Sequence, residues 1–191
     1  PLLDHVVAIQ NRMDFAERQL VQKNLQNVSL AGTFPTHDFG RQMETASRLI
    51  AGGSSVPIIK CALGGFDTHA GQLGRHRRSL TQLAEGLSSF ARAMKGVGMW
   101  DDVLVMTYAE FGRRPRENAS SGTDHGTAAP QLILGGRVRG GFYGEQPPLD
   151  RLEGQNLVYR LDFRAIYATV ARRWWGLDGK FLGPRTLPLI T

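Results

Sequence analysis

The most constraining feature of this sequence is a long polar segment between two apolar runs of strand length. The runs are residues 103–108 and 131–134. The segment between them is rich in glycine and charge, lacks helical spacing and contains the adjacent pair Asp124-His125. In α/β proteins, buried strands hold polar loops whose side chains remain available for binding and catalysis. The pattern therefore predicts two strands joined by a functional loop.

A second junction of the same kind lies earlier in the chain. The apolar run 56–63 leads into Gly64-Gly65-Phe66-Asp67-Thr68-His69, and a helical pattern follows over 71–94. An apolar run of this length is typical of a strand buried on both faces. Strand, helix and strand with short connections form a right-handed βαβ unit, whose strands are parallel. We therefore expect an α/β fold with a mostly parallel sheet and helices on both faces.

Two helices are expected before the first strand. Apolar residues at helical spacing predict one or two helices over residues 2 to about 27. A further helical pattern follows Asp38, which is the expected N-cap, and Gly52-Gly53 is expected to end that helix. His37 is then interpreted as a surface histidine.

The C-terminal part predicts one more strand and one more helix. The strand covers residues 130–134, and a glycine-rich loop or hairpin follows over 135–144. Asp162 is the expected N-cap of a last helix that ends near Gly176.

Composition limits the function classes. The 191 residues, with 41% hydrophobic and 21% charged residues, suit one globular domain over residues 1–191. No transmembrane segment is expected, because no run approaches the roughly 20 apolar residues of a membrane span. The net charge of +6 comes largely from arginine. It indicates either a solvated basic surface or attraction of anionic ligands. No nucleic-acid motif accompanies it, so nucleic acid is not an expected partner.

The two Asp and His pairs are candidate metal ligands. Asp67 and His69 are two residues apart, so in an extended segment their side chains point to one side, roughly 7 Å apart at the Cα atoms. Asp124 and His125 lie between two glycines, whose backbone freedom lets neighbouring side chains face one metal or two. Carboxylate and imidazole ligands suit Zn²⁺, Mn²⁺ or Fe. The alternative roles are a helix cap for an aspartate and a structural hydrogen bond for a histidine.

Glu110 and Arg113 are the candidate catalytic residues. Glu110 follows a predicted strand end and could act as a metal ligand, as a general base or as an ion-pair partner of a nearby arginine. Arg113 begins an arginine-rich run that could clamp an oxyanion or form a solvated loop. Neither a serine nucleophile elbow nor a phosphate-binding P-loop is present in the sequence.

Five motifs follow one another along the chain: Gly64-Gly65-Phe66-Asp67-Thr68-His69-Ala70, Glu110-Phe111-Gly112-Arg113, Gly122-Thr123-Asp124-His125-Gly126, Gly135-Gly136-Arg137-Val138-Arg139-Gly140-Gly141 and Asp162-Phe163-Arg164-Ala165-Ile166-Tyr167. In this order, over roughly residues 38 to 178, they resemble the bacterial family called domain of unknown function 1501. That family is similar to the alkaline phosphatase and sulfatase superfamily. Many members have Trp in place of Phe66.

The resemblance implies a fold, a site and a location. It implies an alkaline-phosphatase-like fold, with Asp124 and His125 as metal ligands and with Asp67 and His69 as ligands of a companion metal. Zinc is the favoured divalent ion, with manganese, iron or calcium as alternatives. Family members are about twice this long, so we expect an incomplete domain that is the C-terminal half of such a protein, with the nucleophile upstream. Twin-arginine export signals in the family imply the periplasm or the cell envelope.

Two functions follow as hypotheses. The first is a metal-dependent hydrolase of phosphate or sulfate esters, with an anionic ester or glycan as substrate. The second is a non-catalytic cell-envelope protein on the same scaffold that binds a partner or an anionic glycan. An exposed strand edge in an incomplete domain would also favour pairing with another chain, and therefore a homo-oligomer.

Overall fold

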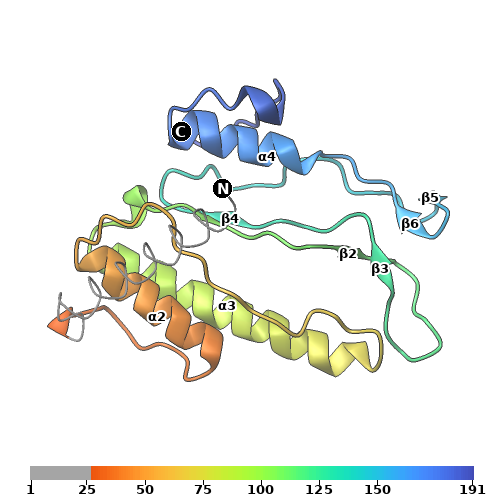
Figure 1. Cartoon of the computed structure of the whole chain (residues 1–191). Coiled ribbons are helices and arrows are strands. Elements are labelled where there is room, and N and C mark those ends of the chain that lie inside the picture. Colours follow the sequence, from red (N-terminus) through yellow and green to blue (C-terminus); the bar gives the residue numbers. More distant parts are fainter. Residues whose placement is uncertain (1–26) are drawn as a thin grey trace, which may run out of the picture. The chain divides into compact units, whose positions relative to one another are not determined.

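The structure is a computed structural model that describes residues 27–191 (Figure 1). The helices predicted over residues 2 to about 27 lie outside the described residues, apart from the last position. The chain divides into two compact units. Within the described residues, the first unit comprises 27–64 and Ser79–Trp100, and the second comprises Gly65–Arg78 and Asp101–Thr191.

The first unit is built on two helices. Helix α2 (Asp38–Ala51) packs against the part of α3 (Gln72–Gly96) that belongs to this unit (Figure 1). The contact is close at Gly86, where an added Cβ would lie 2.5 Å from the Phe39 ring. The sequence therefore has a glycine at a position of α3 that leaves no room for a larger side chain against α2. Phe39 and Met43 of α2 are among the buried residues on this contact.

Helix α2 is capped by a residue other than the predicted one. Nδ1 of His37 accepts a hydrogen bond from the backbone N–H of Gly40 at 3.0 Å, and the His37 backbone is extended. Asp38 already belongs to the helix and pairs with Arg41, so its prediction as N-cap was wrong. His37 is also not a surface histidine, because only 19% of its side chain is exposed. The predicted helix end is confirmed, since Gly53 has a φ of +70°.

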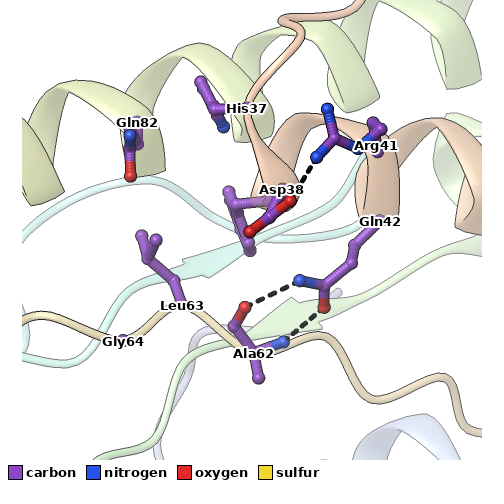
Figure 2. A pocket seen from close by; sticks show the side chains of 9 residues that line it. His37, Asp38, Arg41, Gln42, Ala62, Leu63, Gly64 and Gln82 are labelled. Carbon is purple, nitrogen blue, oxygen red and sulfur yellow. Dashed lines mark hydrogen bonds and ion pairs between the residues drawn. The ribbon is translucent and has the colours of Figure 1, made fainter.

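The predicted strand over residues 56–63 is not a strand. Near its end, the side chain of Gln42 substitutes for a strand partner (Figure 2). Its Nε2 donates to the carbonyl of Ala62 at 2.9 Å, and its Oε1 accepts from the Ala62 N–H at 2.7 Å. A cavity of about 440 Å³ lies beside this contact, next to the start of α2, and His37, Arg41 and Leu63 are among its lining residues.

The second unit contains three two-stranded antiparallel pairs, so the predicted alkaline-phosphatase-like α/β fold with a mostly parallel sheet was wrong. Strand β1 (Val105–Met106) pairs with β4 (Ile133–Leu134), β2 (Gly112–Arg113) with β3 (His125–Gly126), and β5 (Leu152–Glu153) with β6 (Asn156–Leu157). The apolar run 103–108 does contain a strand, β1, but this strand pairs with β4 in the apolar run after the polar loop. The chain folds back through that loop, and the two runs therefore meet in opposite directions.

A helical segment covers the core of the second unit. Helix α4 (Phe163–Thr169) continues into a π-helical turn, η3 (Val170–Trp174), and short 3₁₀ helices occur at η2 (Trp100–Asp102) and η4 (Lys180–Leu182). Asp162 caps α4, as predicted: its carboxylate accepts from the N–H of Arg164 at 2.9 Å.

The core beneath α4 joins the helix to the C-terminal segment. It consists of Ala165, Ile166, Leu187 and Leu189, with Met106 of β1 and Ile133 of β4 packed against it. The buried hydroxyl of Thr169 accepts from the N–H of Leu187 at 2.8 Å. In residues 27–191, no helix is both long and apolar enough to cross a membrane.

Candidate metal centre

The antiparallel pair of β2 and β3 places Arg113 directly opposite His125. The two strands approach closely because each has a glycine in the pair. A Cβ added at Gly126 would lie 2.6 Å from the carbonyl carbon of Arg113, and one added at Gly112 would lie 2.0 Å from the carbonyl oxygen of Ala128. Any larger residue would push the strands apart. The two glycines therefore set the distance between the arginine and the histidine.

A tight turn between β2 and β3 holds the other polar segment. The N–H of Gly71 donates to the carbonyl of Ser120 at 2.9 Å, and the N–H of Thr123 donates to the carbonyl of Thr68 at 3.2 Å. Gly122 is packed against this segment, since an added Cβ would lie 2.2 Å from the carbonyl carbon of His69. These contacts fix residues 67–69 next to β3.

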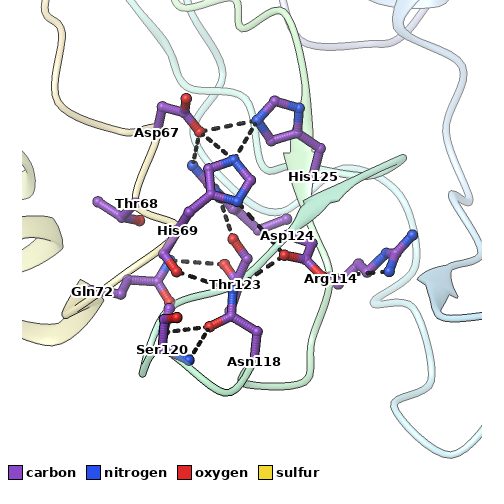
Figure 3. A network of polar contacts seen from close by, with 12 residues as sticks. Asp67, Thr68, His69, Gln72, Arg114, Asn118, Ser120, Thr123, Asp124 and His125 are labelled. Atoms are coloured by element: carbon purple, nitrogen blue, oxygen red, sulfur yellow. Dashed lines mark hydrogen bonds and ion pairs between the residues drawn. The ribbon is translucent and has the colours of Figure 1, made fainter.

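Three donor atoms meet where these segments join, and we call Asp67, His69 and His125 the Asp-His-His cluster (Figure 3). Oδ1 of Asp67 lies 3.0 Å from Nε2 of His69 and 3.0 Å from Nε2 of His125. The two Nε2 atoms are 3.1 Å apart. The cluster is open to solvent, because the side chains are 59%, 49% and 49% exposed in that order.

Arg113 holds the carboxylate of the cluster. Its Nη2 donates to Oδ1 of Asp67 at 2.7 Å and to the carbonyl of Phe66 at 2.6 Å, and its Nη1 donates to the carbonyl of Thr123. Its side chain is 16% exposed. The hydrogen bond from His125, with a further one from Arg113, lowers the pKa of Asp67 below its ordinary value. Arg113 thus joins both segments through contacts inside the protein.

Asp124 lies behind His69 and is not one of the three donors. Its Oδ1 accepts from Nδ2 of Asn118 at 3.1 Å and lies 3.6 Å from Nδ1 of His69. Its Oδ2 lies 3.5 Å from Nη1 of Arg114. The hydrogen bond from Asn118, together with the charge of Arg114, lowers the pKa of Asp124. The carboxylate therefore faces the nitrogen of His69 that is turned away from the cluster.

The ring of His125 is supported by an aromatic side chain. Phe111 stacks on it with ring centroids 3.7 Å apart and an angle of 12° between the planes. The guanidinium carbon of Arg113 lies 5.1 Å from the centroid of the same phenyl ring. Each member of the cluster thus has its own neighbour: Arg113 for the carboxylate, Asp124 for one imidazole and Phe111 for the other.

Sequence reasoning gave no role to Phe111 or to Asn118. Asn118 had a visible signal, because an Asn in a polar loop often caps its own turn through the backbone N–H two residues on, as it does here at Ser120. Phe111 had none beyond its place next to Gly112. Glu110, a predicted catalytic residue, is exposed, and no contact among residues 27–191 joins it to the cluster.

The donor set fits a divalent transition metal. Two imidazole nitrogens and one carboxylate oxygen are ligands that zinc binds at about 2.0–2.2 Å, which places tetrahedral ligands about 3.3 Å apart. The observed separations of 3.0–3.1 Å are close to that value. Hydrogen bonds alone explain the group less well, because one oxygen and two imidazole nitrogens all face the same point. Three protein ligands with one open side are also typical of catalytic rather than structural zinc.

Comparison with known proteins identifies a family but no function. A family model described as "Protein of unknown function (DUF1501)" matches residues 8–180. No curated protein and no solved structure matches the chain significantly. The match covers most of the 191 residues and includes every residue of the cluster. The chain therefore belongs to the DUF1501 family.

Proposed function

We propose that this protein is a metal-dependent hydrolase of phosphate or sulfate esters whose divalent ion is held by Asp67, His69 and His125. The observation that carries the proposal is the convergence of three donor atoms within 3.0–3.1 Å of one another at a solvent-open site. A bound divalent ion would supply Lewis acidity toward an ester oxygen and would lower the pKa of a bound water.

The charges around the cluster support an anionic substrate. Asp67 is paired with Arg113, and Asp124 lies next to Arg114. In each pair the negative charge of the aspartate is balanced by the positive charge of the arginine. A bound divalent ion would therefore give the site a net positive charge. A positive, solvent-open site attracts oxyanions such as phosphate and sulfate esters. The protein's net charge of +6 acts in the same direction.

The chain's own residues would position the ligands and leave the substrate an open side. The arginine run that begins at Arg113 was predicted as an oxyanion clamp or a solvated loop, but Nη1 and Nη2 of Arg113 donate to Asp67 and to two backbone carbonyls. We therefore assign it to holding Asp67 rather than to the substrate. Glu110 remains a candidate general base on sequence grounds. The export signals of the family that the chain resembles add a cell-envelope location to the same proposal.

A turnover assay tests the proposal. The purified protein is stripped with a chelator, reloaded with zinc, manganese, iron or calcium in turn, and supplied with 4-nitrophenyl phosphate or 4-nitrophenyl sulfate. We expect hydrolysis that appears with one of these ions and is lost in Asp67→Asn. Asp178→Asn is the matched control, because Asp178 is an exposed aspartate that pairs with Lys180. Turnover that survives both chelation and Asp67→Asn would exclude this site.

The alternative is a non-catalytic protein that binds an anionic glycan or a protein partner of the cell envelope. One observation favours it: the hydroxyl of Thr123, two residues before His125, is engaged within the protein, because it accepts from Nε2 of Gln72 at 3.0 Å. This alternative predicts metal-dependent retention of sulfated or phosphorylated glycans on an affinity column without any turnover.

A further inference from the structure

Asn118 connects the two segments that form the cluster, although its residue type suggests neither a metal ligand nor a catalyst. Its Nδ2 donates to the carbonyl of His69 at 3.0 Å and to Oδ1 of Asp124 at 3.1 Å. Its Oδ1 accepts from the N–H of Ser120 at 3.0 Å and from the N–H of Gly122 at 3.1 Å. An asparagine side chain offers two donors and two acceptor positions, so all of its capacity is used.

These four bonds have two separate consequences. The two accepted bonds close the turn between β2 and β3, in the manner of an asparagine that caps its own loop (Figure 3). One donated bond reaches the other segment, where it holds the backbone carbonyl of His69, and the second holds the carboxylate of Asp124, the residue directly before β3. The amide of Asn118 therefore fixes both the backbone of His69, from which the imidazole ring extends, and the carboxylate of Asp124 next to that ring.

The resulting arrangement sets the orientation of His69. Its Nδ1 faces Asp124 at 3.6 Å, and its Nε2 faces the other two members of the cluster. A carboxylate next to Nδ1 favours the neutral tautomer with its proton on Nδ1, which leaves the lone pair on Nε2. That lone pair is what a metal ion requires of the ring.

We propose that Asn118 is a positioning residue for divalent metal binding: by holding His69 and Asp124 together, it keeps Nε2 of His69 turned toward Asp67 and His125. The inference rests on the proposed metal site and deepens it. It also gives Asp124, which was predicted as a ligand, the role of orienting His69 from behind.

The variant Asn118→Asp separates the two roles of the side chain. An aspartate keeps the oxygen that closes the turn but loses both donated bonds. Its added negative charge would by itself strengthen the binding of a cation, so a loss of affinity cannot come from simple electrostatics. The matched control is Asn156→Asp, which makes the same change in β6 of the hairpin Leu152–Leu157. Should Asn118→Asp fail to fold, Asn118→Ser keeps a hydroxyl for the turn and cannot reach Asp124.

Zinc affinity is measured by competition with a chromophoric chelator, on protein whose fold is checked by circular dichroism. We expect Asn118→Asp to bind zinc about 10- to 100-fold more weakly than the parent, as is usual when the partner of a metal-ligating histidine is lost. Asn156→Asp should bind like the parent. An unchanged affinity in both Asn118 variants would overturn the inference while leaving the proposed site intact. A parent protein that binds no zinc would overturn both.

A second readout distinguishes positioning from general support of the fold. In the zinc-loaded parent, ¹⁵N NMR of the imidazole rings should show His69 protonated on Nδ1 and coordinated through Nε2. In zinc-saturated Asn118→Asp, we expect the Nδ1 proton of His69 to exchange with water faster than in the parent, because the carboxylate of Asp124 is no longer held beside it. A proton that exchanges as slowly as in the parent would contradict the positioning role.

Discussion

Arg113 is a residue whose contacts within the protein hold the candidate metal site together. It donates to Asp67 and to the carbonyls of Phe66 and Thr123, and it is mostly buried. A lysine at this position has one compact ammonium group and cannot reproduce the planar fork of donors. At least one carbonyl would then lose its partner in a largely desolvated place.

We predict that Arg113→Lys lowers zinc affinity by about 10-fold and the free energy of unfolding by about 1–3 kcal/mol. Chelator competition and urea unfolding provide the two measurements. Arg116→Lys is the control, because Arg116 is exposed on the same loop. If Arg113→Lys matched this control in both measurements, Arg113 would have no positioning role.

At the level of single residues, the sequence predicted part of the Asp-His-His cluster. Asp67 and His69 were expected to point to one side of an extended segment, and the structure brings them together with His125. Asp124 was placed with them because it is adjacent to His125. In a strand, however, successive side chains point to opposite faces, and β3 begins at His125. Asp124 consequently faces the far side of the His69 ring, which spacing alone did not indicate.

Helix contacts give a prediction at the level of elements. Gly86 and Gly74 both lie in α3, but only Gly86 is packed, with the Phe39 ring 2.5 Å from an added Cβ. Around Gly74 there is nothing within 4 Å of such a Cβ. Alanine has a higher helix propensity than glycine by up to about 1 kcal/mol, so the two sites should respond in opposite directions.

We expect Gly86→Ala to lower the free energy of unfolding by about 1–3 kcal/mol, because the overpacked contact must shift. Gly74→Ala should raise that free energy by about 0.4–1 kcal/mol. Urea unfolding followed by circular dichroism compares the two variants. A stabilising effect at both positions would show that α2 and α3 do not pack at Gly86.

The N-cap of α4, Asp162, predicts that the stability of the folded protein depends on pH. Hydrogen bonds from Arg164 lower the pKa of Asp162 from 3.8 to about 2. The ionised carboxylate therefore stabilises the folded state above pH 3.8, and this contribution is lost as the pH falls toward 2. Asparagine also caps helices well but does not titrate. The parent should be more stable than Asp162→Asn at pH 6, with a difference that shrinks on acidification to pH 3. A difference that stays constant across this range, in urea unfolding, would contradict the assignment.

Elements were predicted better than their partners. The helix over 71–94, the glycine end of α2 and the cap of α4 were recognisable, because helix spacing and capping are local properties. The cap of α2 was missed because histidine is an uncommon N-cap, and its neighbour Asp38 has the more typical residue type. The strands were misjudged for a different reason. An apolar run shows that a strand is buried but not which run it pairs with, nor in which direction.

At the scale of the whole molecule, the Asp-His-His cluster forms without the parallel sheet that the sequence predicted. The expected carboxyl edge of parallel strands is absent from residues 27–191. The cluster is assembled instead where the segment 67–69 lies against β3 and the turn between β2 and β3. Close backbone packing at Gly112, Gly122 and Gly126 holds these parts together. Polar segments can thus converge as expected although the scaffold that carries them differs.

The central claim is that Asp67, His69 and His125 together hold one divalent ion. X-ray absorption at the zinc edge, on protein loaded to saturation and freed of excess metal, tests it most directly. The account predicts one zinc per chain, with two imidazole nitrogens and one carboxylate oxygen among its ligands at about 2.0–2.2 Å. It also predicts loss of that zinc in His69→Ala and in His125→Ala. Zinc retained in both variants, or a ligand shell without imidazole, would contradict the account.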